Sequence, residues 1–249
     1  MIDHRQRDGA NWIRLDRPQR GNALDPDTLE ELSAAIDATT SDARAVVVTG
    51  TGSAFCAGAD VSAAAGMIDD DAALLAYMDR ARSVLDELRH LPVPTIAAVN
   101  GVTLAGGLEL LLACDVVIAA ADAPIGDGHT RHGFVPAWGA TAHLPRRIPA
   151  DLAMLMFATG ASWPAAELVG TGLVTEAVEP ARLEDRVREL VGQIATTSNT
   201  AVAEVVRLVR ARAGRSTHDA LRAEREAFSR QCHDASLRAG LARFAPPAE

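Results

Sequence analysis

The chain contains no lysine, so all 24 of its basic residues are arginine. Schiff-base chemistry, attachment of pyridoxal phosphate and a P-loop phosphate site all need a lysine amine, so all three are excluded. The 33 acidic residues leave a formal net charge of −9, which disfavours nucleic acid as a partner. This charge does not favour an anionic ligand either, so binding phosphate groups would need a local cluster of arginines.

Cysteine is scarce. The three cysteines, Cys56, Cys114 and Cys232, are odd in number and scattered, which argues against a disulfide framework and suits a reducing compartment. No stretch approaches 18 consecutive apolar residues, and the first residues lack a basic region followed by an apolar one. We therefore expect neither a membrane span nor a signal peptide, and a cytoplasmic location is the default expectation.

The composition agrees with a globular protein that has a full core, because 48% of the 249 residues are apolar. The Gly-x-Ser-x-Gly motif of many serine hydrolases is absent. Gly50-Thr51-Gly52 follows a strand pattern, but the third glycine of a dinucleotide-binding loop is missing. Cys56 has no base or cation near it in the sequence, so we interpret it as a small packing residue.

Strand and helix patterns alternate along the chain and predict an α/β core. A hairpin is expected around Asp8-Gly9, a helix capped by Asp25, and a second helix capped within Asp69 to Asp71. The second of these helices spans 72–90. The other expected elements are strands 45–49, 95–99 and 116–119, helix 107–113, and C-terminal helices 181–197, 200–212 and 216–231.

Two glycine-containing turns carry the strongest functional signal. The segments Phe55 to Asp60 and Leu104 to Glu109 each follow a β-branched run, and each is interpreted as the backbone at the exit of a strand. An apolar helix follows the second turn, which would place the N–H of Gly106 at its N-terminus. Two such turns could aim two backbone N–H groups at one oxygen, which is the construction of an oxyanion hole.

At these turns the sequence resembles the crotonase, or enoyl-CoA hydratase/isomerase, superfamily. The resemblance runs almost end to end and rests on several motifs in the family's order: Arg17 to Leu24, Phe55 to Asp60, Pro94 to Gly101, Leu104 to Glu109, Cys114-Asp115, Gly133 to Pro136 and Ala165 to Val174. It implies a spiral of ββα units with a C-terminal helical segment, and a coenzyme A thioester as substrate. Coenzyme A would be part of that substrate, with no further cofactor.

The resemblance also assigns residues by position. The hydrogen-bond donors to the thioester carbonyl would be the N–H groups of Ala59 and Gly106. The remaining substrate-binding positions would be Ala23, Leu24, Ala57, Asp60, Val61, Leu104, Gly128 and Trp138. Trp138 replaces a family glycine, which indicates either a reshaped acyl pocket, bounded also by 63–77, or simple core packing. Arg14, Arg17 and Arg20 are the candidate phosphate ligands nearest in sequence to the Asn22-Ala23-Leu24 segment, although a solvated strand end and turn explains each of them equally well.

Glu109 lies three residues after Gly106 and matches one of the two glutamates that move protons in family hydratases. The structural alternative is a favourable acid in the first turn of a helix. Glu109 interrupts an apolar run, where a surface capping role is less natural, so we predict that it is catalytic.

The second family glutamate is missing, and His129 occupies its position. His129 could be a general acid or base, a donor that orients Glu109 or a substrate oxygen, or a histidine of a loop made flexible by Gly126 and Gly128. We favour a role in the active site. A metal site of Asp127, His129 and His132 is a weaker interpretation, because their spacing matches no established zinc pattern.

Two segments are expected: a crotonase-like core over 1–190 and a helical trimerisation segment over 191–249. By resemblance we predict an enoyl-CoA hydratase of fatty acid metabolism that forms a homotrimer or a dimer of trimers. The alternatives are another enolate reaction (isomerisation, decarboxylation, thioester hydrolysis or carbon–carbon cleavage) and a catalytically idle acyl-CoA binder or assembly subunit.

Overall fold

A computed structural model describes residues 1–233, 235–242 and 244 of the chain. Its larger sheet has the strand order β1-β2-β3-β5-β7-β10, in which only β1 is antiparallel to its neighbour. These strands are β1 (Ile2–Arg7), β2 (Ala10–Leu15), β3 (Ala45–Gly50), β5 (Thr95–Val99), β7 (Val116–Ala120) and β10 (Glu176–Val178). The central strands are rich in valine, isoleucine and alanine and are buried on both faces, as expected for a covered parallel sheet.

A second, smaller sheet positions the functional turns. Its order is β4-β6-β8-β9, with β4, β6 and β8 parallel and β9 antiparallel. The strands are β4 (Ala54–Cys56), β6 (Val102–Leu104), β8 (Pro124–Gly126) and β9 (Ser162–Pro164). Three successive units each send a long strand to the large sheet and a short strand to the small one before a helix follows. This repetition is the predicted spiral of ββα units.

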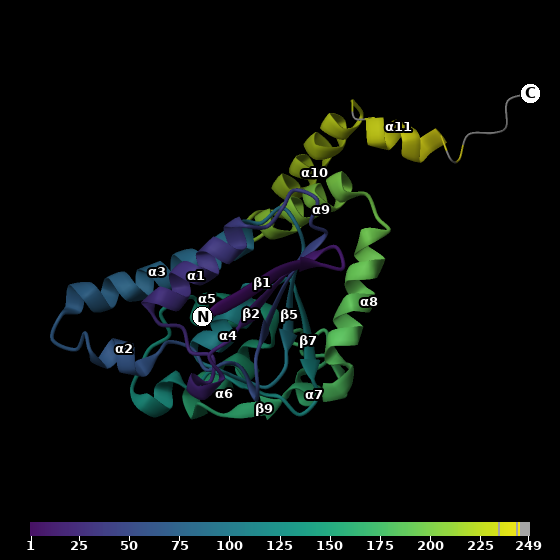
Figure 1. Cartoon of the computed structure of the whole chain (residues 1–249). Helices are drawn as coiled ribbons and strands as arrows, with labels where there is room; N and C mark the ends of the chain where they lie inside the picture. Colours follow the sequence, from purple (N-terminus) through teal and green to yellow (C-terminus); the bar gives the residue numbers. More distant parts are fainter. Residues whose placement is uncertain (234, 243, 245–249) are drawn as a thin grey trace, which may run out of the picture. The chain divides into compact units, whose positions relative to one another are not determined.

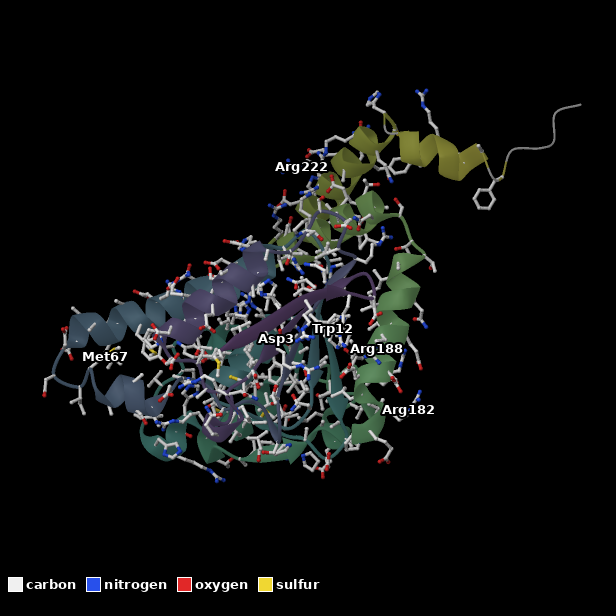
Figure 2. All side chains as sticks on the ribbon, in the orientation of Figure 1. Asp3, Trp12, Met67, Arg182, Arg188 and Arg222 are labelled. Atoms are coloured by element: carbon white, nitrogen blue, oxygen red, sulfur yellow. The ribbon has the colours of Figure 1, made fainter. Side chains whose placement is uncertain are left out.

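Helices cover both faces of the large sheet (Figure 1). On one face α1 (Pro26–Asp37) and α3 (Asp71–His90) lie side by side and contribute Leu29, Leu32 and Leu85 to the main core. On the other face α8 (Leu183–Ala195) packs its apolar side against a cluster that includes Trp12 and Ile96. Figure 2 labels Trp12 on β2 and Arg188 on α8 within this second layer.

Shorter helices connect the strands. They are α2 (Val61–Ala65), α4 (Gly106–Leu112), α5 (Ala140–Arg147), α6 (Ala150–Thr159) and α7 (Ala165–Leu168), with single 3₁₀ turns at Pro18–Arg20, His129–His132 and Pro180–Arg182. Every residue of α4 is buried, because this helix packs against β4, β6 and α5 and its four leucines belong to the main core. Polar atoms on α4 therefore need partners inside the protein.

The chain separates into two compact units, one of Met1–Ile194 and one that starts at Ala195. The second unit contains α9 (Asn199–Ala211), α10 (Thr217–Gln231) and α11 (Ala235–Ala242). The boundary predicted from the sequence falls at 190/191, inside α8. Residues 234, 243 and 245–249 of the predicted C-terminal segment lie outside the described residues. No helix among the described residues is both long and apolar enough to span a membrane.

Local sequence signals predicted most element starts correctly. Asp8 and Gly9 adopt positive φ values of 54° and 82° in the β1–β2 hairpin. Asp25 accepts a hydrogen bond from the N–H of Thr28 at 2.8 Å, and Asp70 caps α3 in the same way. One interpretation was incomplete, because the two functional turns leave the short strands β4 and β6 rather than the long strands at 45–49 and 95–99. Strands of three residues are too short to give a periodic pattern.

Two helical glycines provide a matched test of how closely α4 is packed. A Cβ on Gly107 would lie 1.9 Å from the carbonyl oxygen of Cys56, whereas a Cβ on Gly192 in α8 would meet nothing within 4 Å. We expect Gly107→Ala to lower the free energy of unfolding by about 1–3 kcal/mol or more through overpacking. We expect Gly192→Ala to raise it by roughly 0.5–1 kcal/mol. Urea denaturation measures both, and equal effects would contradict this packing.

Candidate active site

Three neighbouring strands of the small sheet end at one edge. Because β4, β6 and β8 are parallel and adjacent, their carboxyl ends meet, and ligands of α/β proteins commonly bind outside such ends. The segment after β4 contains Ala59, the segment after β6 begins with Ala105 and Gly106, and the segment after β8 contains Asp127 and His129. The sheet thus brings together residues that are up to 70 positions apart in the sequence.

The first turn is fixed by a short bridge to the N-terminal region. The N–H of Leu24 donates to the carbonyl of Gly58 at 2.8 Å, and the N–H of Asp60 donates to the carbonyl of Leu24 at 3.0 Å. This parallel bridge uses the residues on either side of Ala59, so the N–H of Ala59 points away from Leu24. The bridge therefore leaves one backbone donor of this turn available to another acceptor.

The second turn touches the first. Gly58 has a φ of +102°, and a Cβ at that position would lie 2.7 Å from the backbone nitrogen of Gly106. Ala105 has φ +51° and ψ −118°, an uncommon conformation for alanine. Its N–H donates to the carbonyl of Gly126 at 3.2 Å, which ties the turn to the end of β8.

The two N–H groups expected to form the oxyanion hole have no acceptor in the described part of the chain. The parallel bridge leaves the N–H of Ala59 unused, and Gly106 is the first residue of α4, where the N–H lacks an intrahelical partner. The turns are in contact at Gly58 and Gly106. Two unpaired backbone donors on adjoining turns could act on one oxygen, and their role as an oxyanion hole stays a prediction.

Glu109 is a buried carboxylate with one oxygen held and one oxygen presented. Its Oε1 accepts hydrogen bonds from the N–H of Trp138 at 2.8 Å and the N–H of Ala140 at 2.9 Å. Its side chain is only 1% exposed. Burial raises the pKa of the Glu109 carboxyl, and the Ala140 N–H, the His129 ring and the Trp138 N–H oppose this rise. Glu109 also lies in the first turn of α4, so its position is compatible with the alternative of a favourable acid at a helix N-terminus, although its Oε1 is held by backbone N–H groups of another segment.

The second oxygen of Glu109 faces His129. Glu109 Oε2 lies 3.8 Å from His129 Nε2, and the His129 side chain is 13% exposed. On the other side of the ring, Nδ1 lies 2.9 Å from Oδ1 of Asp127, while the backbone N–H of His129 donates to Asp127 Oδ2 at 3.1 Å. His129 therefore lies between two buried carboxylates rather than in a free loop.

Trp138 closes the site on the side of the second turn. It is 1% exposed, and a Cβ on Gly106 would lie 2.1 Å from Cζ3 of its indole ring. The ring thus covers the start of α4, while the backbone N–H of the same residue holds Glu109. Both the pocket interpretation and the packing interpretation of Trp138 are compatible with this position.

The carboxylate of Asp60, predicted as a substrate-binding residue, already has several partners. It accepts hydrogen bonds from Ser62 and Ala63 N–H groups at 3.0 and 3.3 Å, which caps α2, and pairs with Arg17 at 3.2 Å. Arg17 also pairs with Asp25 at 2.9 Å. These contacts give Asp60 and Arg17 a role in holding the loops together.

The other predicted binding positions are distributed around the turns. Ala23 and Leu24 are buried, and the carbonyl of Ala23 accepts a hydrogen bond from the Arg17 side chain at 2.7 Å. Val61 is 63% exposed at the start of α2. Ala57 and Leu104 are half-buried within their turns, and Gly128 has a positive φ of 74°.

The three candidate phosphate ligands differ in position. Arg14 approaches Glu184 of α8 at 3.5 Å, so it lies on the sheet face that α8 covers. Arg17 is occupied by the carboxylates of Asp25 and Asp60. Arg20 is exposed and donates to Ser62 Oγ at 3.3 Å, which places it beside the first turn. Of the three, Arg20 is the one with an exposed guanidinium next to the site.

Sequence analysis missed three contributors to this geometry. Asp127 was considered only as a metal ligand, although an acid two residues before a histidine could have suggested a hydrogen bond between the two. Tyr77 of α3 contacts both the carbonyl of Leu24 and the N–H of Asp60, and so fixes the first turn from a distant helix. The backbone donors of Trp138 and Ala140 had no sequence signal at all.

Two alternative chemistries receive no structural support. Burial raises the pKa of the Cys56 thiol to about 12, so this residue remains a neutral packing group. Within the described residues, no cluster of three or more His, Cys, Asp or Glu side chains is arranged to hold a metal ion. Asp127 and His129 are hydrogen-bonded to each other instead.

Solved structures of similar proteins share this architecture. An enoyl-CoA hydratase from Bacillus anthracis is 33% identical with a TM-score of 0.92, over 98% of this chain and 95% of that chain. An enoyl-CoA hydratase from Polaromonas sp. JS666 is 27% identical with a TM-score of 0.92, over 98% and 96% of the two chains. The predicted crotonase fold is confirmed.

Sequence comparison agrees. The family model described as enoyl-CoA hydratase/isomerase matches residues 5–247. The fatty acid oxidation complex subunit alpha of Idiomarina loihiensis is 38% identical over 177 residues, which are 70% of this chain but only 25% of that relative's length. The chain belongs to the enoyl-CoA hydratase/isomerase family.

The two hydrogen bonds to Glu109 Oε1 predict a difference between two substitutions. Glu109→Gln keeps an acceptor oxygen for the N–H groups of Trp138 and Ala140, whereas Glu109→Ala leaves both buried donors unsatisfied. We expect Glu109→Ala to lower the free energy of unfolding by at least about 2 kcal/mol more than Glu109→Gln does. Urea denaturation at neutral pH measures the difference, and equal stability of the two variants would contradict the anchoring role.

The raised pKa of Glu109 predicts how stability depends on pH. Below its ordinary value of 4.5 the carboxyl is protonated in both the folded and unfolded states. Above that value the unfolded chain releases this proton more readily than the folded protein does, because a buried charge is costly. The free energy of unfolding therefore falls until the pH has passed the higher pKa of the folded state. The free energy of unfolding of the wild type minus that of Glu109→Gln should fall as pH rises from about 4.5. A constant difference across that range would contradict the raised pKa.

Proposed function

We propose that the protein is an enoyl-CoA hydratase, which adds water across the double bond of an α,β-unsaturated acyl thioester. The observation that carries this proposal is the approach of two shielded acid–base groups, with Glu109 Oε2 and His129 Nε2 3.8 Å apart. They lie at the same sheet edge as the two backbone donors. Coenzyme A enters as part of the substrate, and no further cofactor takes part.

The carbonyl oxygen of the thioester would accept hydrogen bonds from the N–H groups of Ala59 and Gly106. Negative charge develops on this oxygen when a nucleophile adds to the β-carbon and an enolate forms. Preorganised backbone donors stabilise such a charge, and loss of one typically costs about 2.7–4 kcal/mol of activation free energy. The contact between the two turns supports a single acceptor for both groups.

Glu109 and His129 would handle the protons. The presented oxygen of Glu109 takes a proton from water while the oxygen of that water bonds to the β-carbon. The Nε2–H of the His129 imidazolium then protonates the α-carbon. Glu109 is left as a carboxylic acid and His129 as a neutral ring. Transfer of the proton from Glu109 to Nε2 across their short separation restores the starting state.

Further expectations complete the proposal. Arg20 is the best-placed cation for a coenzyme A phosphate, because its guanidinium is exposed beside the first turn. Trp138 would limit the room for the acyl chain near Gly106. We also propose a place in cytoplasmic fatty acid metabolism. By family resemblance, helices α9 and α10 would mediate a homotrimer or a dimer of trimers.

One observation favours a second candidate function, that of a catalytically idle acyl-CoA binder. Because Glu109 Oε1 anchors the segment of Trp138 and Ala140, the glutamate has a structural reason to be present even without chemistry. The loss of the second family glutamate agrees with this candidate. The His129 ring opposite the presented oxygen argues for catalysis, since an anchor needs only one carboxylate oxygen.

The test is hydration of crotonyl-CoA, followed by loss of the absorbance of the conjugated enoyl thioester. Wild type should turn over, and Glu109→Gln should lose roughly 10²–10⁴-fold in kcat because it cannot accept the proton of water. Binding of an acyl-CoA measured by calorimetry should be retained in this variant. Glu167→Gln, an exposed substitution in α7, is the control and should keep full activity.

Other outcomes would redirect the proposal. Binding without turnover by the wild type would favour either the idle binder or a different enolate reaction, and product analysis with isomerisable, carboxylated and β-keto acyl-CoA esters would separate these. Turnover that survives Glu109→Gln would remove Glu109 from the mechanism and leave it only as an anchor.

A further inference from the structure

Asp127 is a fully buried carboxylate, with 0% side-chain exposure. A buried charge needs hydrogen-bonding partners, because removing it from water is costly. In the described part of the chain, both hydrogen-bonding partners of Asp127 belong to one residue. Oδ2 accepts the backbone N–H of His129 at 3.1 Å, and Oδ1 contacts ring Nδ1 at 2.9 Å. The family resemblance assigns no role to this acid.

The backbone around Asp127 is held rigidly on its strand side. Asp127 directly follows β8, whose last residue Gly126 accepts a hydrogen bond from Ala105 N–H at 3.2 Å. A Cβ on Gly126 would lie 2.3 Å from the carbonyl oxygen of Ala161, so the strand end is closely packed. The position of Asp127 is therefore fixed relative to the turn that carries Gly106.

A purely local role does not account for both contacts. An aspartate that only stabilises a turn needs one oxygen for the N–H two residues further on. Here the second oxygen also engages the imidazole, and an ionised carboxylate can only accept hydrogen bonds. The proton of the neutral ring must then sit on Nδ1. This leaves the lone pair on Nε2, the nitrogen that faces Glu109 at 3.8 Å.

We propose that Asp127 is a positioning residue that fixes the tautomer and orientation of His129, so that Nε2 alone exchanges protons with the substrate and Glu109. The inference rests on the proposed function. When Nε2–H protonates the α-carbon, the neutral ring keeps Nδ1–H and continues to donate it to Asp127, which stays ionised. The proton that Glu109 took from water then returns to Nε2. After this transfer Glu109, His129 and Asp127 are all in their starting protonation states.

The first test is spectroscopic and needs no activity. In uniformly ¹⁵N-histidine-labelled full-length protein, the signals of His129 are assigned by their absence in His129→Gln. At a pH where the ring is neutral, its Nδ1 should show the shift of a protonated nitrogen and Nε2 that of an unprotonated one. A neutral ring protonated on Nε2 would overturn the proposal, even in a protein that hydrates no substrate.

The second test is kinetic. Asp127→Asn keeps an acceptor for the His129 backbone N–H but turns an amide N–H₂ donor towards Nδ1, which favours the opposite tautomer. We expect kcat for crotonyl-CoA to fall roughly 10²–10⁴-fold, with KM nearly unchanged. Circular dichroism and urea denaturation establish that the variant is folded. An unchanged kcat in a folded Asp127→Asn protein would overturn the proposal.

A double-substitution cycle separates positioning from a general structural role. If Asp127 acts through His129, adding Asp127→Asn to His129→Gln should change kcat by less than about twofold. A full further loss in that background would show that Asp127 acts by another route. If the wild type shows no turnover, the proposed function fails, while the ¹⁵N measurement still decides the tautomer.

Discussion

The hydrogen bonds between Glu109 Oε1 and the backbone of Trp138 and Ala140 organise the centre of this protein. They satisfy a carboxylate inside a helix that is otherwise buried among leucines, and they provide acceptors for N–H groups at the start of α5. Without them, a charged residue on α4 would be costly. With them, one carboxylate oxygen is held in place and the other is presented to His129.

The remaining components of the site gather around that carboxylate because of sheet topology. Parallel strands β4, β6 and β8 each end at the same edge, so the segments that follow them are neighbours despite their separation in sequence. Glycine makes the contact between the first two turns possible, since a Cβ at Gly58 or Gly107 would collide with backbone. His129 is hydrogen-bonded to a buried carboxylate of the same segment, Asp127, through both its backbone N–H and its ring Nδ1.

Much of the fold was predictable, because local chemistry decides it. The Asp8-Gly9 hairpin and the caps Asp25 and Asp70 depend on backbone conformation and a nearby side-chain oxygen, and both are visible in a few consecutive residues. Short strands such as β4 and β6 were not predicted, because three residues give no periodic pattern and pair only with distant segments. The partners of Glu109 were also not predictable, since backbone N–H groups carry no residue-type signal.

The order of residues along the chain was enough to assign the family, the α/β class and the two glycine turns, and to single out Glu109 and His129, whose side chains lie 3.8 Å apart in the structure. The absence of lysine likewise excluded whole classes of mechanism. Folding in three dimensions was needed to show that Arg17 and Asp60 hold each other, that Glu109 divides its oxygens between an anchor and His129, and that Asp127 binds the ring's other nitrogen. These are contacts between side chains and backbone on separate strands or loops, and their distances exist only once the two sheets have packed.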